Sequence, residues 1–86
     1  EVTPRLTTAS ASRETWQATH HYEVVCLFDW FWRVERDGRL LGTVAEMHGQ
    51  WRGWVGAICL HLMSPPKVAE EARREMVKKV IGYLEN

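Results

Sequence analysis

Six side chains in this sequence are of the types used in metal binding and nucleophilic catalysis. They are His20, His21, His48, His61, Cys26 and Cys59. Zinc sites place such ligands at short, recurring intervals along the chain. The intervals here fit none of those patterns, and adjacent residues such as His20 and His21 point to opposite faces of a strand. The sequence therefore predicts no metal site, and we expect no cofactor.

Cys59 and His61 are spaced so that a thiol and an imidazole share one face of a strand. A Cys–His pair can act as nucleophile and base, but such a site also needs a group that orients the base and donors that stabilise an oxyanion. No third residue or glycine-rich loop of this kind accompanies the pair, so we expect a protein that is not an enzyme. Two cysteines are too few for a disulfide framework, which predicts reduced thiols and a cytoplasmic location.

Four arginines close to aromatic residues form a second candidate site, one for nucleic acid. They are Arg33, Arg36, Arg39 and Arg52. Arginine and aromatic rings together can hold phosphates and stack bases. Acidic residues interleave with these arginines, and the chain has 11 basic and 11 acidic side chains. Strong non-specific phosphate binding needs a clustered basic excess, so nucleic-acid binding is the alternative rather than the favoured function.

The segment from Trp16 to Val34 must position most of these side chains, because its even positions are nearly all apolar or aromatic. Alternation of this kind is typical of strands that bury one face. The segment is too long for one strand of a small domain. We expect a break near Asp29, with strands over 20–28 and 30–36, and a single bulged strand as the alternative. Residues 1–15 have no such pattern and are expected to form a flexible or extended segment before one domain over 16–86.

Asp37-Gly38 is the clearest turn signal, because both central residues of a two-residue hairpin need positive φ. It predicts a strand over 39–47, and the glycine-containing turn at residues 48–50 predicts another over 52–62. The register would pair Arg36 with Arg39, Val34 with Leu41, and Trp32 with Thr43. This register places Trp30 and Trp32 on the buried face of the sheet.

Ser64-Pro65-Pro66 is typical of a helix start, and a helix is expected over 65–84. Its apolar stripe is Val68, Ala72, Met76, Val80 and Leu84. The fold class is therefore α+β, an antiparallel meander of three to four strands with one C-terminal amphipathic helix packed across one face.

A single helix covers only one face of a sheet, so the apolar residues on the other face need another cover. By the expected register these are Val25, Leu27, Phe31, Leu40, Val44, Trp51 and Val55. We expect them to form a protein-binding or dimer face.

The sequence thus favours a small non-enzymatic protein-interaction module that acts as an adaptor or inhibitor of a larger protein or complex. We expect a protein partner and a homodimer through the uncovered face. Five tryptophans in 86 residues support binding, because aromatic residues dominate interface energetics. Phage and mobile-element proteins of this size often have such roles. Nucleic-acid binding through the four arginines, or through the basic side of the helix, is the alternative. No apolar run is long enough to predict a membrane span.

Overall fold

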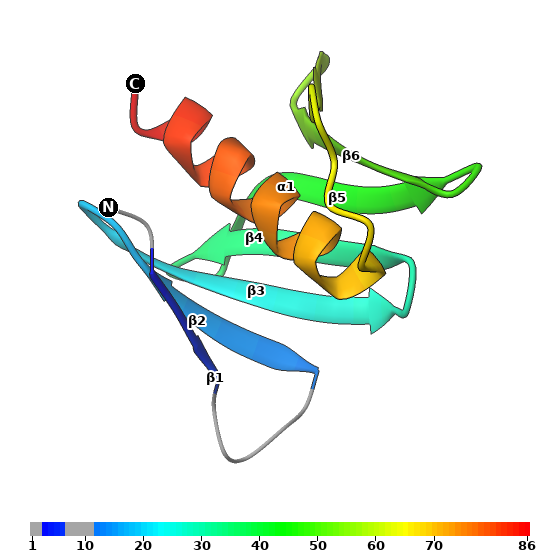
Figure 1. Cartoon of the computed structure of the whole chain (residues 1–86). Coiled ribbons are helices and arrows are strands. Elements are labelled where there is room, and N and C mark those ends of the chain that lie inside the picture. The colour runs from blue at the N-terminus through cyan, green and yellow to red at the C-terminus, as the bar shows by residue number, and fades with distance from the viewer. Residues whose placement is uncertain (1–2, 7–11) are drawn as a thin grey trace.

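The computed structural model describes residues 3–6 and 12–86, with side chains from residue 12 onward. One antiparallel sheet and one helix contain most of these residues (Figure 1). The strands follow one another in space in the same order as in the chain. They are β1 (Thr3–Leu6), β2 (Arg13–Gln17), β3 (His21–Phe28), β4 (Phe31–Arg36), β5 (Arg39–Met47), β6 (Gln50–Val55) and β7 (Ile58–His61), and α1 (Ala69–Leu84) follows them.

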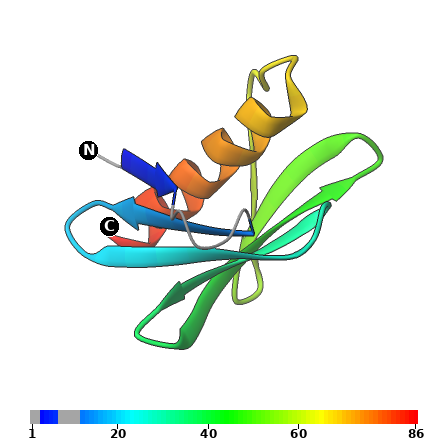
Figure 2. The same cartoon turned by 90° about the horizontal axis from the view of Figure 1, so that it is seen from below.

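The helix α1 lies across one face of this meander, mainly over β5 and β6. Figure 2 shows a strongly twisted sheet, in which the strands around β5 cross those around β2 at a wide angle. Twist of this kind lets an antiparallel sheet wrap around a single helix. We call the side of the sheet under α1 the helix face and the other side the open face.

The predicted antiparallel meander with one C-terminal helix across one face is confirmed, but the predicted number of strands is wrong. The expected strand over 52–62 is two strands, β6 and β7, whose ends Val55 and Ile58 pair. Gly56 lies between them with a φ of +60°, which glycine adopts at little cost. A strand β2 also precedes the expected ones, and a turn over residues 18–20 separates it from β3.

The expected N-terminal segment over 1–15 contains β1 and the first part of β2. These two strands pair in an antiparallel ladder that runs from Thr3 opposite Gln17 to Leu6 opposite Glu14. Residues 1–2 and 7–11 lie outside the described residues. The break expected near Asp29 is present, because β3 ends at Phe28 and β4 begins at Phe31.

The predicted turn at Asp37 and Gly38 is confirmed, with φ values of 52° and 76° and with Arg36 opposite Arg39. Beyond it the predicted register is wrong by one residue. The pairing shifts between Val34 and Glu35, and Val34 lies opposite Gly42 instead of Leu41. Leu41 is the extra residue of a β-bulge, and such an insertion moves the following side chains to the other face.

The helix begins at Ala69 rather than near residue 65, and Val68 is its N-cap residue without a side-chain hydrogen bond. Ser64 therefore does not cap it. Proline disfavours helical backbone in the residue before it, here Ser64 and Pro65, and bends at residues 67–68 precede the helix.

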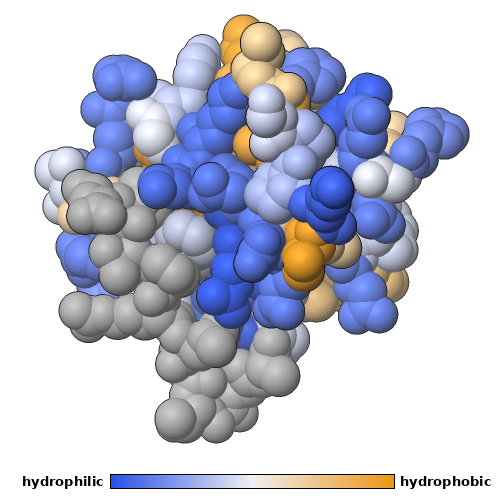
Figure 3. Space-filling view, in the orientation of Figure 1, coloured by the Kyte–Doolittle hydropathy of each residue, from blue (hydrophilic) through white to orange (hydrophobic). Residues whose placement is uncertain are grey.

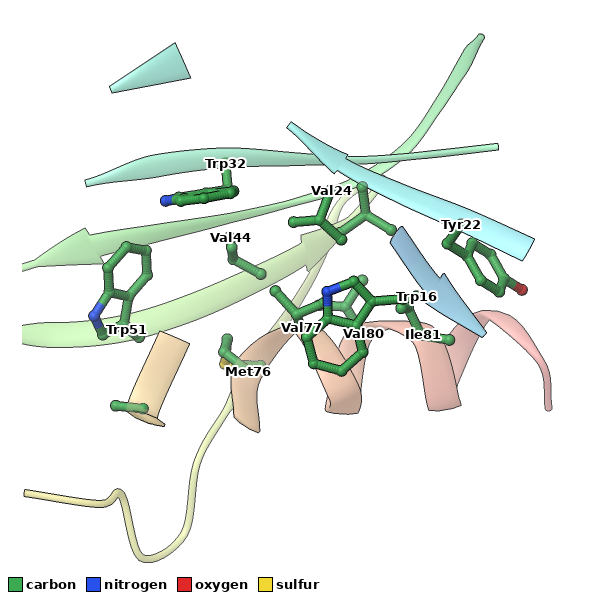
Figure 4. Close-up of a cluster of buried hydrophobic side chains, with 12 residues drawn as sticks. Trp16, Tyr22, Val24, Trp32, Val44, Trp51, Met76, Val77, Val80 and Ile81 are labelled. Atoms are coloured by element: carbon green, nitrogen blue, oxygen red, sulfur yellow. The ribbon is translucent and has the colours of Figure 1, made fainter. Parts of the chain in front are cut away.

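The core lies between α1 and the helix face of the sheet (Figure 4). Its buried residues are Trp16, Tyr22, Val24, Trp32, Val34, Val44, Trp51, Ala72, Met76, Val77, Val80 and Ile81. The predicted burial of Trp32 is confirmed. The predicted burial of Trp30 is wrong, because Trp30 lies in the β3–β4 turn, where strand alternation does not apply, and is 51% exposed.

Gly53 allows a close approach between α1 and the sheet. A Cβ atom at Gly53 would lie 2.5 Å from a methyl carbon of Val80 and 2.9 Å from Cε of Met76. A Cβ atom at Gly82, within α1, would meet nothing within 4 Å. The contact with β6 therefore depends on a residue without a side chain.

We expect Gly53→Ala to lower the free energy of unfolding by about 1–3 kcal/mol, because the helix must move away from β6. The control Gly82→Ala should raise it by about 0.5–1 kcal/mol, since alanine is the better helix former. Urea denaturation measures both. Equal stability of Gly53→Ala and the parent protein would contradict the packing described here.

Candidate functional site

Three aromatic rings gather at the turn that joins β3 to β4. The pairing of these strands shifts between Cys26 and Phe28, so that Phe28 lies opposite Phe31. Directly opposed residues point to the same face of a sheet. Trp30 stacks on Phe28 with ring centroids 5.4 Å apart and planes 8° from parallel, and its centroid is 5.9 Å from that of Phe31. The bulge at Leu27 thus builds an aromatic cluster on the open face.

Two further apolar side chains extend this cluster. Leu27 is the bulge residue itself and is exposed. Met47 is also exposed and lies two residues beyond Ala45, the partner of Phe31, which places it on the same face and at the same end of the sheet. We call Leu27, Phe28, Trp30, Phe31 and Met47 together the aromatic tip. It is an apolar surface in which Phe28 is 58% exposed.

Two ion pairs lie in the middle of the open face. Ion pairs join Arg13 to Glu23 at 2.7 Å and Arg33 to Glu35 at 3.1 Å. Val25 of β3 pairs with Arg13 of β2 on one side and with Arg33 of β4 on the other, and it is half-buried. The view onto the helix side of the molecule is mainly hydrophilic, with only small hydrophobic patches (Figure 3). Two further apolar side chains lie on the open face outside the aromatic tip, the exposed Leu40 opposite Glu35 and the half-buried Trp54 opposite Thr43.

The structure divides the seven residues predicted for a protein-binding or dimer face. Val25, Leu27, Phe31 and Leu40 are away from the helix face, as expected. The prediction is wrong for the other three, because Val44 and Trp51 are buried in the core and Val55 packs against it. The bulge at Leu41 moves Val44 to the helix face, and β6 pairs with β5 in the shifted register.

The four arginines predicted as possible nucleic-acid contacts lie in two different parts of the sheet. Arg52 pairs with Ala45, which pairs with Phe31, so it lies on the open face close to the aromatic tip. Arg33 lies in the neighbouring row of the same face. Arg36 and Arg39 are at the opposite end of β4 and β5, beside the Asp37 turn. The structure therefore brings two of the four close to the exposed rings.

Cys59 and His61 lie on the edge strand β7 with their Sγ and Nε2 atoms 3.6 Å apart. Both side chains are exposed. Among the residues that the structure describes, no group of three or more His, Cys, Asp and Glu side chains could hold a metal ion.

A pocket of about 230 Å³ lies on the other side of the β3–β4 turn, next to the start of α1. It is lined by Asp29, Trp32, Trp51, Ala69, Glu70 and Arg73. The guanidinium of Arg73 lies over the ring of Trp32, 3.9 Å from its centroid. Cation–π contacts of this kind are favourable when they are shielded from water. The turn therefore has the aromatic tip on one side and this pocket on the other.

Arg73 is held in place by a buried ion pair with Glu14 of β2. Its two terminal nitrogens donate to the carboxylate oxygens at 3.1 and 2.6 Å, and the indole of Trp16 donates to the same carboxylate at 3.0 Å. Glu14 is 2% exposed and Arg73 is 4% exposed. Desolvation raises the pKa of Glu14, but the hydrogen bonds from Arg73 and Trp16, together with the charges of Arg73 and Arg74, outweigh it and keep this pKa below its ordinary value.

Sequence reasoning missed this pair. Glu14 falls in the segment expected to be flexible or extended, and the apolar stripe predicted for the helix does not include Arg73. One signal was present in the sequence: Glu14 is two residues before Trp16 and so continues the even row of the buried face.

Glu85 fixes the other end of the helix. Its carboxylate accepts hydrogen bonds from the backbone N–H groups of Thr19 and His20 and from the hydroxyl of Tyr22, at 2.9 to 3.1 Å. Desolvation raises the pKa of Glu85, but the backbone donors of His20 and Thr19, together with side-chain hydrogen bonds from Tyr22 and Thr19, outweigh it and lower the pKa overall. The β2–β3 turn and the end of α1 are thereby joined.

Comparisons of this chain with protein-family models, with curated proteins and with solved structures find no match. In the described part of the chain, α1 is neither long nor apolar enough to cross a membrane.

We expect Glu14→Gln to lower the free energy of unfolding at neutral pH by about 3–5 kcal/mol, because it removes the carboxylate closest to the buried charge of Arg73 and leaves only the exposed Glu70, 3.8 Å away. The folded-state pKa of Glu14 is lowered, so its contribution is complete above its ordinary pKa of 4.5 and is lost as pH falls through the lowered value. The variant should therefore lose less stability on acidification than the parent protein. Some acid dependence should remain in it, because the pKa of Glu85 is also lowered.

Denaturation across acidic pH measures this, with Glu75→Gln on the exposed side of α1 as the control. An unchanged acid dependence in Glu14→Gln would refute this role for Glu14.

Proposed function

We propose that this chain is a small non-enzymatic protein-binding module that docks its aromatic tip on a larger protein and so acts as an adaptor or inhibitor. The observation that carries the proposal is the stacked and exposed pair Phe28 and Trp30, which Phe31 adjoins at the β3–β4 turn.

The chemistry of the aromatic tip favours a protein surface as the partner. Tryptophan is among the residues that most often dominate binding energy at the centre of an interface. Stacking restricts the rings of Phe28 and Trp30 before binding, so less side-chain entropy is lost when a partner arrives. A buried aromatic ring supplies roughly 150–250 Å² of contact, whereas a stable interface needs about 800 Å² on each partner. The interface must therefore extend beyond the aromatic tip.

A second copy of the chain is one such protein partner, but the dimer face expected from the sequence is reduced. Three of its seven residues contribute to the core or pack against it, and Val25 and Phe31 are already half-buried in the monomer. A different protein is therefore the partner that we favour, and self-association is included in the test.

Single-stranded nucleic acid is the second candidate ligand. Arg52 lies on the open face, with Ala45 between it and Phe31 in the pairing and Trp54 two residues along its own strand. A groove that combines arginine with aromatic rings can hold a strand by stacking and phosphate contacts. Arg33 adds less, because Glu35 neutralises it at 3.1 Å. The balanced charge of the chain also lowers the attraction for phosphates.

The test compares Trp30→Ser with Ile58→Ser, which removes a similarly exposed apolar side chain from the edge strand β7. Proteins retained from the native host by the immobilised parent chain are identified, and their affinities are then measured by titration. Trp30→Ser should weaken the binding by about tenfold or more, whereas Ile58→Ser should leave it almost unchanged. Circular dichroism verifies that both variants are folded.

Equal affinity of the parent chain and Trp30→Ser for the retained protein would rule out the aromatic tip as the binding surface. Sedimentation of both forms reports whether a second copy uses the same surface. Salt-dependent binding of a labelled single-stranded oligonucleotide that Arg52→Gln weakens, without any protein partner, would establish the second candidate instead.

A further inference from the structure

The edge strand β7 places a thiol and an imidazole next to each other on the open face. Cys59 pairs with Trp54 of β6, and His61 pairs with Arg52, which lies on that face. The Sγ and Nε2 atoms of the pair are 3.6 Å apart, and both side chains are exposed. A sulfur at about 2.3 Å and a nitrogen at about 2.1 Å from one tetrahedral zinc ion lie about 3.6 Å from each other. The pair therefore already has the separation that two ligands of one zinc ion have.

One chain supplies only half of such a site. Structural zinc sites have four protein ligands. Within the described part of one chain, no group of three or more suitable side chains could hold a metal ion. The expectation of no metal site, drawn from the sequence, likewise concerns ligands within one chain. The two further ligands must come from another molecule, and a second copy of this chain carries the same pair.

The outer edge of β7 can receive a second copy. β7 is the last strand of the sheet, and no strand that the structure describes pairs with its outer edge. Val55 and Ile58 pair across the two-residue turn, where a β-turn joins the carbonyl of its first residue to the N–H of its fourth. Pairs with and without hydrogen bonds alternate from there along an antiparallel ladder. By this alternation the backbone groups of Cys59 and His61 are directed away from β6.

A contact from the helix agrees with this orientation. Lys79 of α1 donates from Nζ to the carbonyl oxygen of His61, as expected for a carbonyl that does not face β6. A carbonyl oxygen has two lone pairs, so this one can also accept from a neighbouring strand. Leu60, in contrast, lies opposite Gly53, and its side chain points to the helix face.

A two-fold axis that passes beside Leu60, perpendicular to the sheet, satisfies the backbone groups and the ligands in one register. The two β7 strands then run antiparallel, with Cys59 of each copy opposite His61 of the other. Such an axis keeps the open faces of both copies on the same side. Opposed Cβ atoms in a sheet are about 5 Å apart, and alternate ones along a strand are about 7 Å apart. The four side chains therefore surround one point.

We propose that Zn²⁺ joins two copies of this chain at β7, bound by Cys59 and His61 of each copy. Two sulfur and two nitrogen ligands in a tetrahedron are a combination typical of zinc. Each thiol releases its proton to the solvent as it binds, and each imidazole binds in its neutral form. Two thiolates balance the charge of the ion, so the complete site carries no net charge beside the neighbouring Arg52. The contact does not use the aromatic tip, and the inference is independent of the proposed function.

The test adds Zn²⁺ to the full chain, with a phosphine reductant that keeps the thiols reduced. One zinc ion per two chains should double the mass in sedimentation, and EDTA should reverse the change. Cys59→Ser and His61→Gln should each abolish the zinc-dependent dimer, because the site then loses two of its four ligands. The matched controls Cys26→Ser and His21→Gln, away from β7, should retain it.

Two further measurements report the ligands and the register. Co²⁺ in place of zinc should give thiolate-to-metal charge-transfer absorption and the intense visible bands of a tetrahedral site, both saturating at one ion per two chains. Zinc should also protect the amide hydrogens of Cys59 and His61 from exchange, because each becomes bonded to the other copy.

Saturation at one ion per chain without any increase in mass would overturn the proposal. A zinc-dependent dimer that Cys59→Ser retains would do the same, since the contact would then lie elsewhere. A dimer in which the amide hydrogens of Cys59 and His61 still exchange freely would exclude the pairing of the two β7 strands.

Discussion

The buried ion pair between Glu14 and Arg73 is the interaction on which the rest of this structure depends. It joins β2, near one edge of the sheet, to α1, which packs mainly over β5 and β6. Burial of two charges costs several kcal/mol per ion unless geometry and further hydrogen bonds compensate, and here Trp16 supplies such a bond. The guanidinium of Arg73 also covers the ring of Trp32 and lines the pocket. One side chain therefore positions the helix, part of the core and one wall of the candidate site.

Two inserted residues determine where the apolar side chains are exposed. The bulge at Leu27 brings Phe28 opposite Phe31 and leaves the rings on the open face. The bulge at Leu41 returns Val44 to the core. Beyond each inserted residue the side chains point to the opposite face of the sheet from the one that uninterrupted alternation would give. The aromatic tip and the buried core are thus products of the same local irregularities.

Strand alternation made much of the fold predictable, since Trp16, Tyr22, Val24, Trp32 and Val34 are buried as their even positions indicate. It did not reveal the bulges, because the pattern of one strand does not specify its register with the next. The positive φ required at Asp37 and Gly38 made that turn predictable. The candidate site was harder to predict from the sequence. Strand pairing and ring contacts, rather than spacing along the chain, bring Leu27, Phe28 and Phe31 together. Glu14 was missed because its partner is distant in the chain, although its even position marked the buried face.

A double-mutant cycle on Glu14 and Arg73 tests the central claim most directly. Glu14→Leu, Arg73→Met and the double variant are compared with the parent chain by urea denaturation at neutral pH. Each single variant should lose about 3–5 kcal/mol, since it removes the closest partner of a buried charge, and the double variant should recover most of that loss. The predicted coupling is about 3 kcal/mol or more. Additive losses in the double variant would show that the two side chains act independently and would contradict the account.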